Sequence, residues 1–245
     1  MVQTSKTSCF SVSKELSVIV RTANQSIKKQ PCLWLIHGSG GISSNDDLWV
    51  DAALSKGYTV IQVDSYSNRN VFKQHWDRAD EYRIPWDIRA DDQLVSHSFL
   101  QNHQNMIPFA NIFNSIVVGF SDGATASLLL QAADKPDIWK ANYCLYPALP
   151  KWLITELPII RSNKVFLFVG ELDNWTPAIG CQMLQAKIGC HLHIFPDTHH
   201  SFSKPGINQW HENTMRTKTE RGVFCQYSEQ STKKTMEIVF DEQFL

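Results

Sequence analysis

The stretch GFSDGA, residues 119–124, follows an apolar run and opens a segment rich in Ala and Leu. A glycine–x–serine–x–glycine pattern between a strand and a helix is typical of a nucleophile elbow. This is a tight turn that projects a serine hydroxyl above the edge of a sheet. The alternative is an ordinary glycine turn that matches the pattern by chance. The residues before and after the stretch decide between the two.

Short apolar runs alternate with longer segments of mixed polarity along the whole chain. The runs are rich in Val, Ile and Phe and show little polar alternation, which is typical of strands buried on both faces. They lie at residues 32–38, 58–65, 115–120, 142–147, 164–171 and 190–197, with an edge strand expected at 15–21. Helices are expected at residues 48–57, 87–106, 122–133, 177–188 and 232–240. This alternation predicts an α/β fold with a mainly parallel sheet and helices on both faces.

Composition limits the classes of partner and location. The chain has 245 residues, is 43% hydrophobic and carries a net charge of −1, which gives no electrostatic reason to expect nucleic acid or an anionic membrane. No apolar run approaches the ~20 residues that span a bilayer. The polar first residues lack the apolar core of a secretory signal, and none of the six cysteines forms a CxxC pair. We therefore expect a cytoplasmic protein with reduced thiols and a small-molecule substrate, and neither nucleic acid nor membrane as a partner.

Candidate partners for Ser121 follow two later strands. A serine hydroxyl attacks a carbonyl only when an oriented base accepts its proton. Asp173 comes after the run at 164–170, and His199 and His200 come after the run at 190–197. In a parallel sheet these positions share the edge at which Ser121 lies. Serine, acid and histidine in this order therefore predict a catalytic triad at that edge.

Two choices within this triad stay open on the residues alone. Glu171 is a rival acid, although it lies directly at the strand end, and Asp173 could instead cap the helix that begins near Pro177. Only one of the two adjacent histidines can be the base, and the other would line the pocket.

The glycine-rich segment HGSGG, residues 37–41, follows an apolar strand as an oxyanion loop does. We expect the backbone N–H of Ser39 to pair with that of Asp122 to bind an oxyanion. A phosphate-binding turn is the alternative, but no GxGxxG or GK[ST] spacing is present. The Asp122 carboxylate is expected to be favourably placed at a helix N-terminus and turned away from the site, rather than to select substrate.

A long, charged and aromatic segment at residues 66–86 leaves a strand at the same edge. Loops of this length are commonly functional. Five residues are predicted to bind substrate. Trp76, Trp86 and Trp175 would form an aromatic or apolar wall, Gly40 belongs to the glycine loop, and His199 is the second histidine. His191 and His193 alternate on one strand, and we expect a surface pair on an edge strand rather than a metal site.

The segments HGSGG, GFSDGA, VGELDNWTP and THHSF together resemble the dienelactone hydrolase family of α/β-hydrolases, over roughly residues 31–202. The resemblance implies Ser121 as nucleophile, Asp173 as acid and His200 as base. It also implies a single domain, residues 1–245, with about eight strands, no separate lid domain and no metal or organic cofactor. The founding members carry cysteine at the nucleophile position and an acidic residue near the oxyanion loop, and here Ser121 and HGSGG occupy these places.

The leading hypothesis is a serine hydrolase that cleaves a carboxylic ester, lactone or thioester through an acyl-enzyme. An alternative keeps the triad but uses it as a biosynthetic cyclase, an acyltransferase or a C–C bond hydrolase, motivated by Asp122 and the long aromatic loop. A third is a binding protein without catalysis. The ordered serine, acid and histidine argue against it.

Overall fold

The structure is a computed structural model that describes residues 2–11, 14–23, 29–71, 84–211 and 222–240. Of the long aromatic segment predicted to be functional, only its two ends are therefore described. Trp76 lies outside the described residues. Within the described ranges, no helix combines the length and apolar character needed to cross a bilayer.

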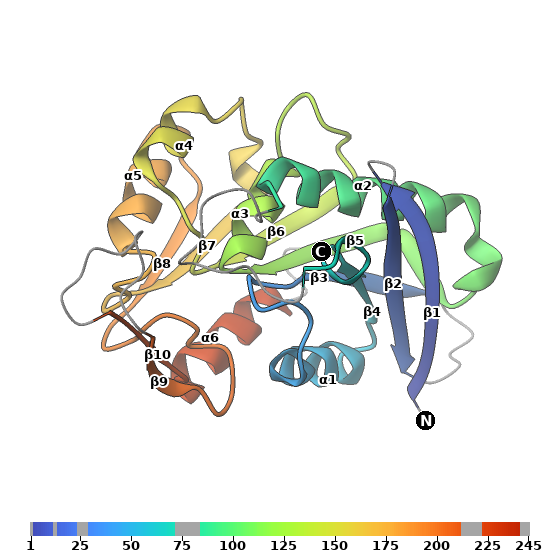
Figure 1. Cartoon of the computed structure of the whole chain (residues 1–245), viewed down its shortest axis with the longest axis horizontal. Helices are drawn as coiled ribbons and strands as arrows, with labels where there is room; N and C mark the ends of the chain where they lie inside the picture. Colours follow the sequence, from blue (N-terminus) through green and yellow to red (C-terminus); the bar gives the residue numbers. More distant parts are fainter. Residues whose placement is uncertain (1, 12–13, 24–28, 72–83, 212–221, 241–245) are drawn as a thin grey trace.

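Eight strands form one sheet in the order β1-β2-β4-β3-β5-β6-β7-β8 (Figure 1). Every neighbouring pair from β4 through β8 is parallel, whereas β1 pairs antiparallel with β2 and β2 antiparallel with β4. The strands are β1 Val2–Ser11, β2 Lys14–Ala23, β3 Gln30–Ile36, β4 Thr59–Asp64, β5 Ala110–Phe120, β6 Trp139–Leu145, β7 Val165–Gly170 and β8 His191–Phe195. The predicted mainly parallel sheet is confirmed.

Six α-helices cover the sheet. They are α1 Asp47–Ser55, α2 Trp86–Asn102, α3 Asp122–Leu129, α4 Lys151–Glu156, α5 Ala178–Ile188 and α6 Glu229–Val239 among the described residues. Helices α1 and α6 lie on one face and α2 to α5 on the other (Figure 1). Five of these helices match predicted segments. The sequence did not predict α4, because six residues are too few to show a helical period.

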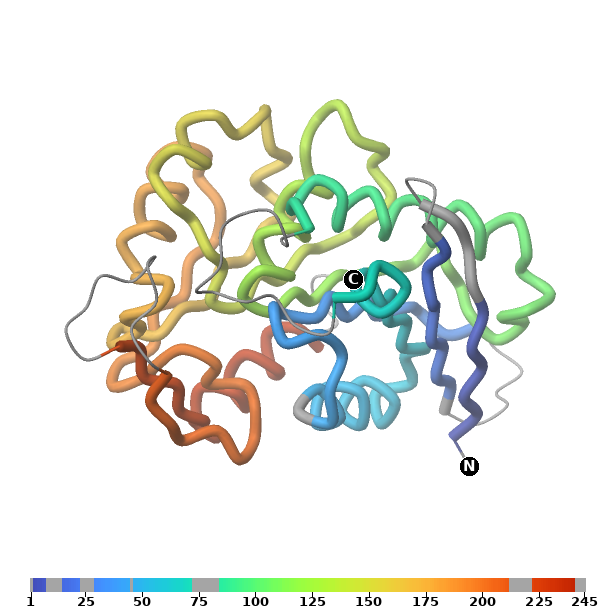
Figure 2. The backbone as a smooth tube through the Cα atoms, in the orientation of Figure 1, coloured from blue at the N-terminus to red at the C-terminus, as the bar shows by residue number. Residues whose placement is uncertain are grey.

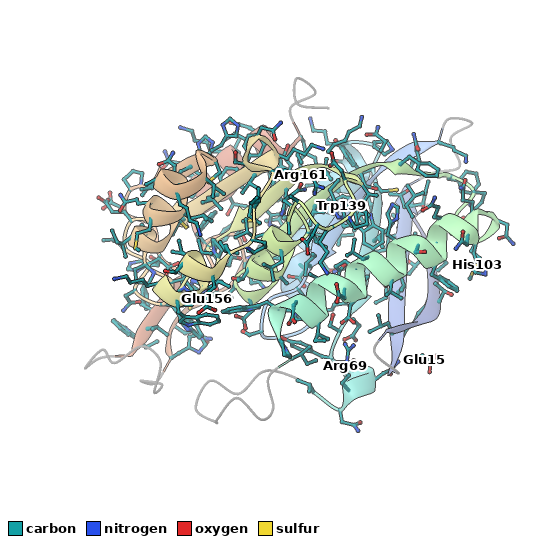
Figure 3. The ribbon with its side chains drawn as sticks, turned by 90° about the horizontal axis from the view of Figure 1, so that it is seen from above. Glu15, Arg69, His103, Trp139, Glu156 and Arg161 are labelled. Carbon is teal, nitrogen blue, oxygen red and sulfur yellow. The ribbon has the colours of Figure 1, made fainter. Side chains whose placement is uncertain are left out.

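Alternate side chains of the central strands supply the two cores. Leu33 and Leu35 of β3 pack with Trp49 of α1, whereas Trp34 between them packs with Ala90 of α2. Trp139 meets the Trp34 ring edge-on, with 5.0 Å between the ring centroids. Figure 3 shows Trp139 in the interior near α2, and His103 at the C-terminal end of that helix. The continuous apolar runs in the sequence arise because both faces of these strands are covered.

Strand β1 was not predicted. Residues Val2 to Lys6 are exposed, and the strand is held as an edge by its antiparallel pairing with β2. The exposed first half of this strand is mostly polar, so it shows no hydrophobic pattern from which a strand could be predicted. Its backbone pairing alone places it in the sheet.

A second, two-stranded sheet was also not predicted. It consists of β9 Asn208–His211 and β10 Val223–Gln226, paired antiparallel. The tube trace shows it beside the loops that follow β7 and β8 (Figure 2). This position places it next to the edge of the sheet where the predicted triad residues lie.

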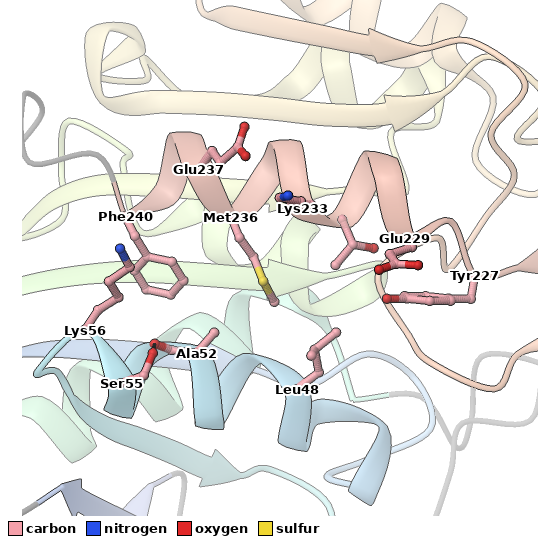
Figure 4. Close-up of a pocket in the computed structure, with 11 residues that line it drawn as sticks. Leu48, Ala52, Ser55, Lys56, Tyr227, Glu229, Lys233, Met236, Glu237 and Phe240 are labelled. Carbon is pink, nitrogen blue, oxygen red and sulfur yellow. Dashed lines mark hydrogen bonds between the residues drawn. The ribbon is translucent and has the colours of Figure 1, made fainter.

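A groove of about 470 Å³ runs between α1 and α6 (Figure 4). Its apolar lining includes Leu48, Ala52, Met236 and Phe240, and Lys56 and Glu237 lie at its edges. None of the residues predicted to act in catalysis lines it.

Candidate active site

The elbow is a strained turn between β5 and α3. Ser121 has φ 52° and ψ −118°, a conformation that costs a side-chain-bearing residue about 1–3 kcal/mol. A Cβ atom at Gly119 would lie 2.6 Å from the Gly123 carbonyl oxygen, and one at Gly123 would lie 2.3 Å from the carbonyl oxygens of both Ile36 and His37. Both glycines of the pattern are therefore required by close backbone contacts.

The structure brings Ser121, His200 and Asp173 into one hydrogen-bonded chain. His200 Nε2 lies 3.2 Å from Ser121 Oγ, and His200 Nδ1 lies 2.8 Å from Asp173 Oδ2. The three side chains are buried in the loops that follow β5, β8 and β7. In the neutral imidazole that fits these partners, Nδ1–H donates to the carboxylate and Nε2 accepts from the serine hydroxyl.

The Asp173 carboxylate is oriented by its own loop. Oδ1 accepts the backbone N–H groups of Trp175 at 2.9 Å and Thr176 at 2.7 Å, and Oδ2 accepts the Thr176 hydroxyl at 2.9 Å. Helix α5 begins only at Ala178, after the N-cap Pro177, so these bonds form a turn that precedes the helix. The rival acid Glu171 is exposed, and the structure places no contact between it and His200 among the described residues. Thr176 was not among the residues predicted for the site.

The two adjacent histidines have different surroundings. His199 contacts Phe224 edge-on at 4.7 Å, and its Nδ1 lies 3.2 Å from the Leu172 carbonyl oxygen. The His200 ring is flanked by Tyr146 at 4.8 Å and by Trp175 at 5.0 Å between ring centroids. Geometry therefore selects His200 as the histidine that meets Ser121. Trp175 is half-buried beside the His200 ring.

The glycine loop lies against the elbow. A Cβ at Gly38 would be 3.2 Å from the Phe120 carbonyl oxygen and 3.7 Å from Ser121 Cβ, and a turn closes with Gly41 N–H donating to the Gly38 carbonyl at 3.2 Å. Ser39 and the exposed Gly40 form the tip of this turn.

Asp122 is the first residue of α3, where backbone N–H groups have no acceptor within the helix. The helix dipole adds a partial positive charge at this end. The glycine loop and the start of α3 therefore both adjoin Ser121.

A buried arginine fixes the start of the glycine loop. The Arg89 guanidinium, on α2, donates to the His37 carbonyl oxygen and lies 5.1 Å from the centre of the Tyr66 ring. Burial, together with the charge of Arg89, lowers the pKa of His37 to about 3. The neutral ring donates from Nδ1 to the Gly38 carbonyl at 2.8 Å and accepts the Ser65 N–H at Nε2 at 3.4 Å. No sequence motif marks an arginine inside a helix for this role.

Trp86 and Asp122 are joined directly. The indole Nε1–H donates to Asp122 Oδ1 at 3.2 Å, and both side chains are buried. The Trp86 ring also stacks with Trp152 at 6.0 Å between centroids, and Trp152 is exposed. Trp86 was predicted to form part of a substrate wall, and the structure places it under Trp152 with its polar edge on Asp122.

His191 and His193 were expected to form a surface pair on an edge strand, and the cysteines were expected to be reduced thiols. His191 and His193 lie on the edge strand β8, and their rings stack on Phe166 at 4.4 Å and Phe168 at 5.0 Å. Across the described ranges, no three His, Cys, Asp or Glu side chains gather as metal ligands would. Burial raises the pKa of the Cys144 thiol to about 12, which makes it a poor nucleophile at neutral pH.

Comparisons with known proteins identify the family and the fold of the chain. The sequence matches the dienelactone hydrolase family over residues 16–241. No curated protein sequence matches the chain. Among solved structures, a protein from Klebsiella pneumoniae subsp. pneumoniae assigned as a dienelactone hydrolase superposes with a TM-score of 0.72 at 14% identity, covering 99% of each chain.

Two further structures of metagenomic origin show the same fold. The dienelactone hydrolase-like promiscuous phosphotriesterase P91 has a TM-score of 0.70 at 13% identity, covering 99% of this chain and 97% of that one. The α/β-hydrolase MGS-M1, from a Medee basin deep-sea library, has a TM-score of 0.63 at 19% identity and covers 98% of each chain. The α/β-hydrolase fold predicted from the sequence is thus confirmed. Because the family match spans nearly the whole chain, this protein is a hydrolase that belongs to the dienelactone hydrolase family.

Proposed function

We propose that this protein is a serine hydrolase that cleaves a carboxylic ester, lactone or thioester through an acyl-enzyme. The observation that carries the proposal is the hydrogen-bonded chain from Ser121 Oγ through His200 to Asp173, with distances of 3.2 and 2.8 Å. Such a chain raises the nucleophilicity of a serine hydroxyl, because the base is in place and already oriented.

In the first half-reaction, Ser121 Oγ attacks the substrate carbonyl carbon while His200 Nε2 takes the hydroxyl proton. Asp173 stabilises the imidazolium that results. The carbonyl oxygen becomes an oxyanion, and the backbone N–H groups of Ser39 and Asp122 would donate to it. The tetrahedral intermediate then collapses, and His200 protonates the departing alcohol or thiol.

In the second half-reaction, water replaces the leaving group. His200 Nε2 takes a proton from water as the water oxygen attacks the acyl carbon. The intermediate collapses, the proton returns to Ser121 Oγ, and a carboxylic acid leaves. For a lactone the leaving alcohol stays attached, and the product is a hydroxy acid. No step needs a metal or an organic cofactor.

Serine is favoured over cysteine as the nucleophile by the surroundings of the thiols. The five described free cysteines are all buried. Cys144 lies on β6 directly beside Gly119 of the elbow strand, yet burial raises its thiol pKa to about 12. Each of these thiols is therefore protonated and shielded, unlike the reactive thiolates of cysteine hydrolases.

An aromatic or apolar group is the proposed substrate feature. Trp175 lies half-buried against the His200 ring, and the exposed Trp152 stacks on Trp86. These rings would give a substrate an apolar surface to contact. Space for it is also open at Gly40, at the tip of the glycine loop, because no atom lies within 4 Å of a Cβ position there.

The test is intact mass spectrometry after treatment with a fluorophosphonate. Wild type should gain one adduct and Ser121→Ala none, and iodoacetamide should leave ester turnover unchanged. Turnover of p-nitrophenyl esters and of lactones should fall by about four orders of magnitude or more in Ser121→Ala. Product analysis with added alcohols and amines then separates hydrolysis from acyl transfer. Full ester turnover by Ser121→Ala would refute the proposal.

A further inference from the structure

The hairpin β9–β10 stands outside the main sheet but touches both loops that carry the base and the acid. A two-stranded sheet is marginally stable by itself, so its position depends on its attachments. Two of these attachments lead to the catalytic loops. They connect Asp173 and His200 through a route that is separate from their own hydrogen bond.

The first attachment is the side chain of Asn174, next to the acid. Its Nδ2 donates to the Gly222 carbonyl oxygen at 3.1 Å, and its Oδ1 accepts the Phe224 backbone N–H at 3.1 Å. One carboxamide thus pairs with two alternate residues of one strand end, as a peptide group of a neighbouring strand would. The pairing requires both a donor and an acceptor, which an asparagine supplies.

The second attachment joins the same strand to the histidine. The Gln226 N–H donates to the His200 carbonyl oxygen at 3.1 Å, and Cys225 pairs with His200 in a parallel bridge. A ring contact adds to this link, since Trp175 lies 5.0 Å from the His200 ring and 5.1 Å from the His211 ring of β9. Strand β10 therefore holds Asn174 at one end and His200 at the other.

The two loops are also joined at their base, closer to the sheet. The Glu171 N–H donates to the Phe195 carbonyl at 2.8 Å and the Leu172 N–H donates to the Thr198 carbonyl at 2.9 Å. Asp173 and His200 lie beyond this last base contact. Bonds within the acid loop fix the Asp173 carboxylate locally, but they do not fix its distance from the other loop.

We propose that Asn174 is a positioning residue that holds His200 at hydrogen-bond distance from Asp173, acting through strand β10. The inference rests on the proposed function for its kinetic consequences only. The Asp173–His200 bond itself can be measured without any substrate. Without the carboxamide, the acid loop separates from β10, and the imidazolium loses part of its carboxylate stabilisation.

The experiment compares Asn174→Ala with a matched control, Asn208→Ala, in the full chain. Asn208 is an exposed asparagine at the start of β9, so its replacement deletes a carboxamide from the hairpin itself rather than from the acid loop. The downfield proton resonance of His200 Nδ1–H, assigned by its absence in His200→Ala, is recorded at the same pH in each variant. In parallel, kcat and KM are measured with an ester that wild type cleaves.

Asn174→Ala should move the His200 Nδ1–H resonance upfield, because the proton of a longer hydrogen bond to the Asp173 carboxylate is less deshielded. It should lower kcat about 10- to 100-fold with KM close to that of wild type, as expected for a small displacement of a catalytic group. Asn208→Ala should change neither quantity. Asn174→Asp keeps the acceptor for Phe224 but faces the Gly222 carbonyl with a carboxylate, so its kcat should lie between those of wild type and Asn174→Ala.

An unchanged His200 Nδ1–H resonance and an unchanged kcat in Asn174→Ala would overturn the inference. Equal changes in Asn174→Ala and Asn208→Ala would also overturn it, since they would indicate a general weakening of the hairpin. If wild type neither reacts with a fluorophosphonate nor cleaves esters, the proposed function fails. The position of the His200 Nδ1–H resonance then still decides the positioning role.

Discussion

Trp86, the first residue of α2, donates its indole N–H at 3.2 Å to Asp122, the first residue of α3 and the neighbour of Ser121. This bond connects two helix starts at the edge of the sheet where Ser121, His200 and Asp173 meet. The bond also gives the Asp122 carboxylate a hydrogen-bond donor. This helps to explain why a carboxylate can lie next to Ser121, where negative charge would develop during the proposed reaction.

The Asp122 acceptor can be tested by a pair of substitutions. Asp122→Ala leaves the buried Trp86 N–H without this partner and should lower the free energy of unfolding by about 1–3 kcal/mol. Asp122→Asn retains an acceptor oxygen at the same place and should lose less. Urea unfolding followed by tryptophan fluorescence measures both, and equal losses in the two variants would exclude the hydrogen bond as the cause.

Gly123 is expected to accept no side chain. A Cβ there would lie 2.3 Å from two carbonyl oxygens of β3 and the loop after it, so Gly123→Ala must displace the elbow or the glycine loop. We expect destabilisation of about 3 kcal/mol. Gly40→Ala is the control, because no atom lies within 4 Å of its Cβ position, and it should stay within about 0.5 kcal/mol of wild type. Thermal and urea unfolding compare the two, and a wild-type midpoint for Gly123→Ala would contradict the steric argument.

Thr176 supports the acid through one hydroxyl. Its Oγ1 donates to Asp173 Oδ2 at 2.9 Å and lies 3.1 Å from His200 Nδ1. Thr176→Val removes this hydroxyl at nearly constant volume and should lower kcat about tenfold or more, with a small change in KM, if the triad acts as proposed. Thr176→Ser keeps the hydroxyl and should recover most of the rate. Steady-state kinetics on one ester suffices, and similar rates for the valine and serine variants would rule out the contribution of the hydroxyl.

His37 should make the folded state less stable in acid. In the folded protein its pKa is lowered to about 3, mainly because the ring is buried and also because the charged Arg89 lies beside it. In an unfolded chain the pKa would be 6.5. Between these values the unfolded chain binds a proton that the folded state does not, so stability falls as the pH falls through this window and is fully present above it. The slope from this group alone is at most about 1.4 kcal/mol per pH unit.

Replacing the histidine should remove that slope. In His37→Gln, the free energy of unfolding between pH 7.5 and pH 5 should depend less on pH than in wild type. His103→Gln, which deletes an exposed histidine at the end of α2, should leave the wild-type slope unchanged. Urea unfolding at several pH values gives the slopes, and parallel curves for His37→Gln and wild type would show that His37 does not remain neutral.

Several parts of the fold could be predicted because their buried apolar residues are close together in the sequence. The six apolar runs became β3 to β8, and the segment at residues 15–21 became part of β2, which the structure extends to Lys14–Ala23. Strand β1, helix α4 and the hairpin β9–β10 were missed. Each is short or exposed, so hydrophobic patterning carries little information about it.

Within the candidate site, the residue types and their order named Ser121 but left the acid and the histidine open, and the resemblance to the family then indicated Asp173 and His200. The sequence gives no information on the orientation of these side chains. In the structure, the His200 ring turns toward Ser121, and the turn at Trp175 and Thr176 directs the Asp173 carboxylate.

The sequence by itself therefore determined the α/β architecture, the elbow and the edge of the sheet at which its partners lie, because these follow from local periodicity and from residues at strand ends. Only the tertiary structure decided the contacts made by Arg89 to His37, by Trp86 to Asp122 and by Asn174 to strand β10. These residues lie 52, 36 and 48 positions from their partners along the chain. Contacts between such distant positions arise from how helices and loops pack together, and no local pattern of residues encodes them.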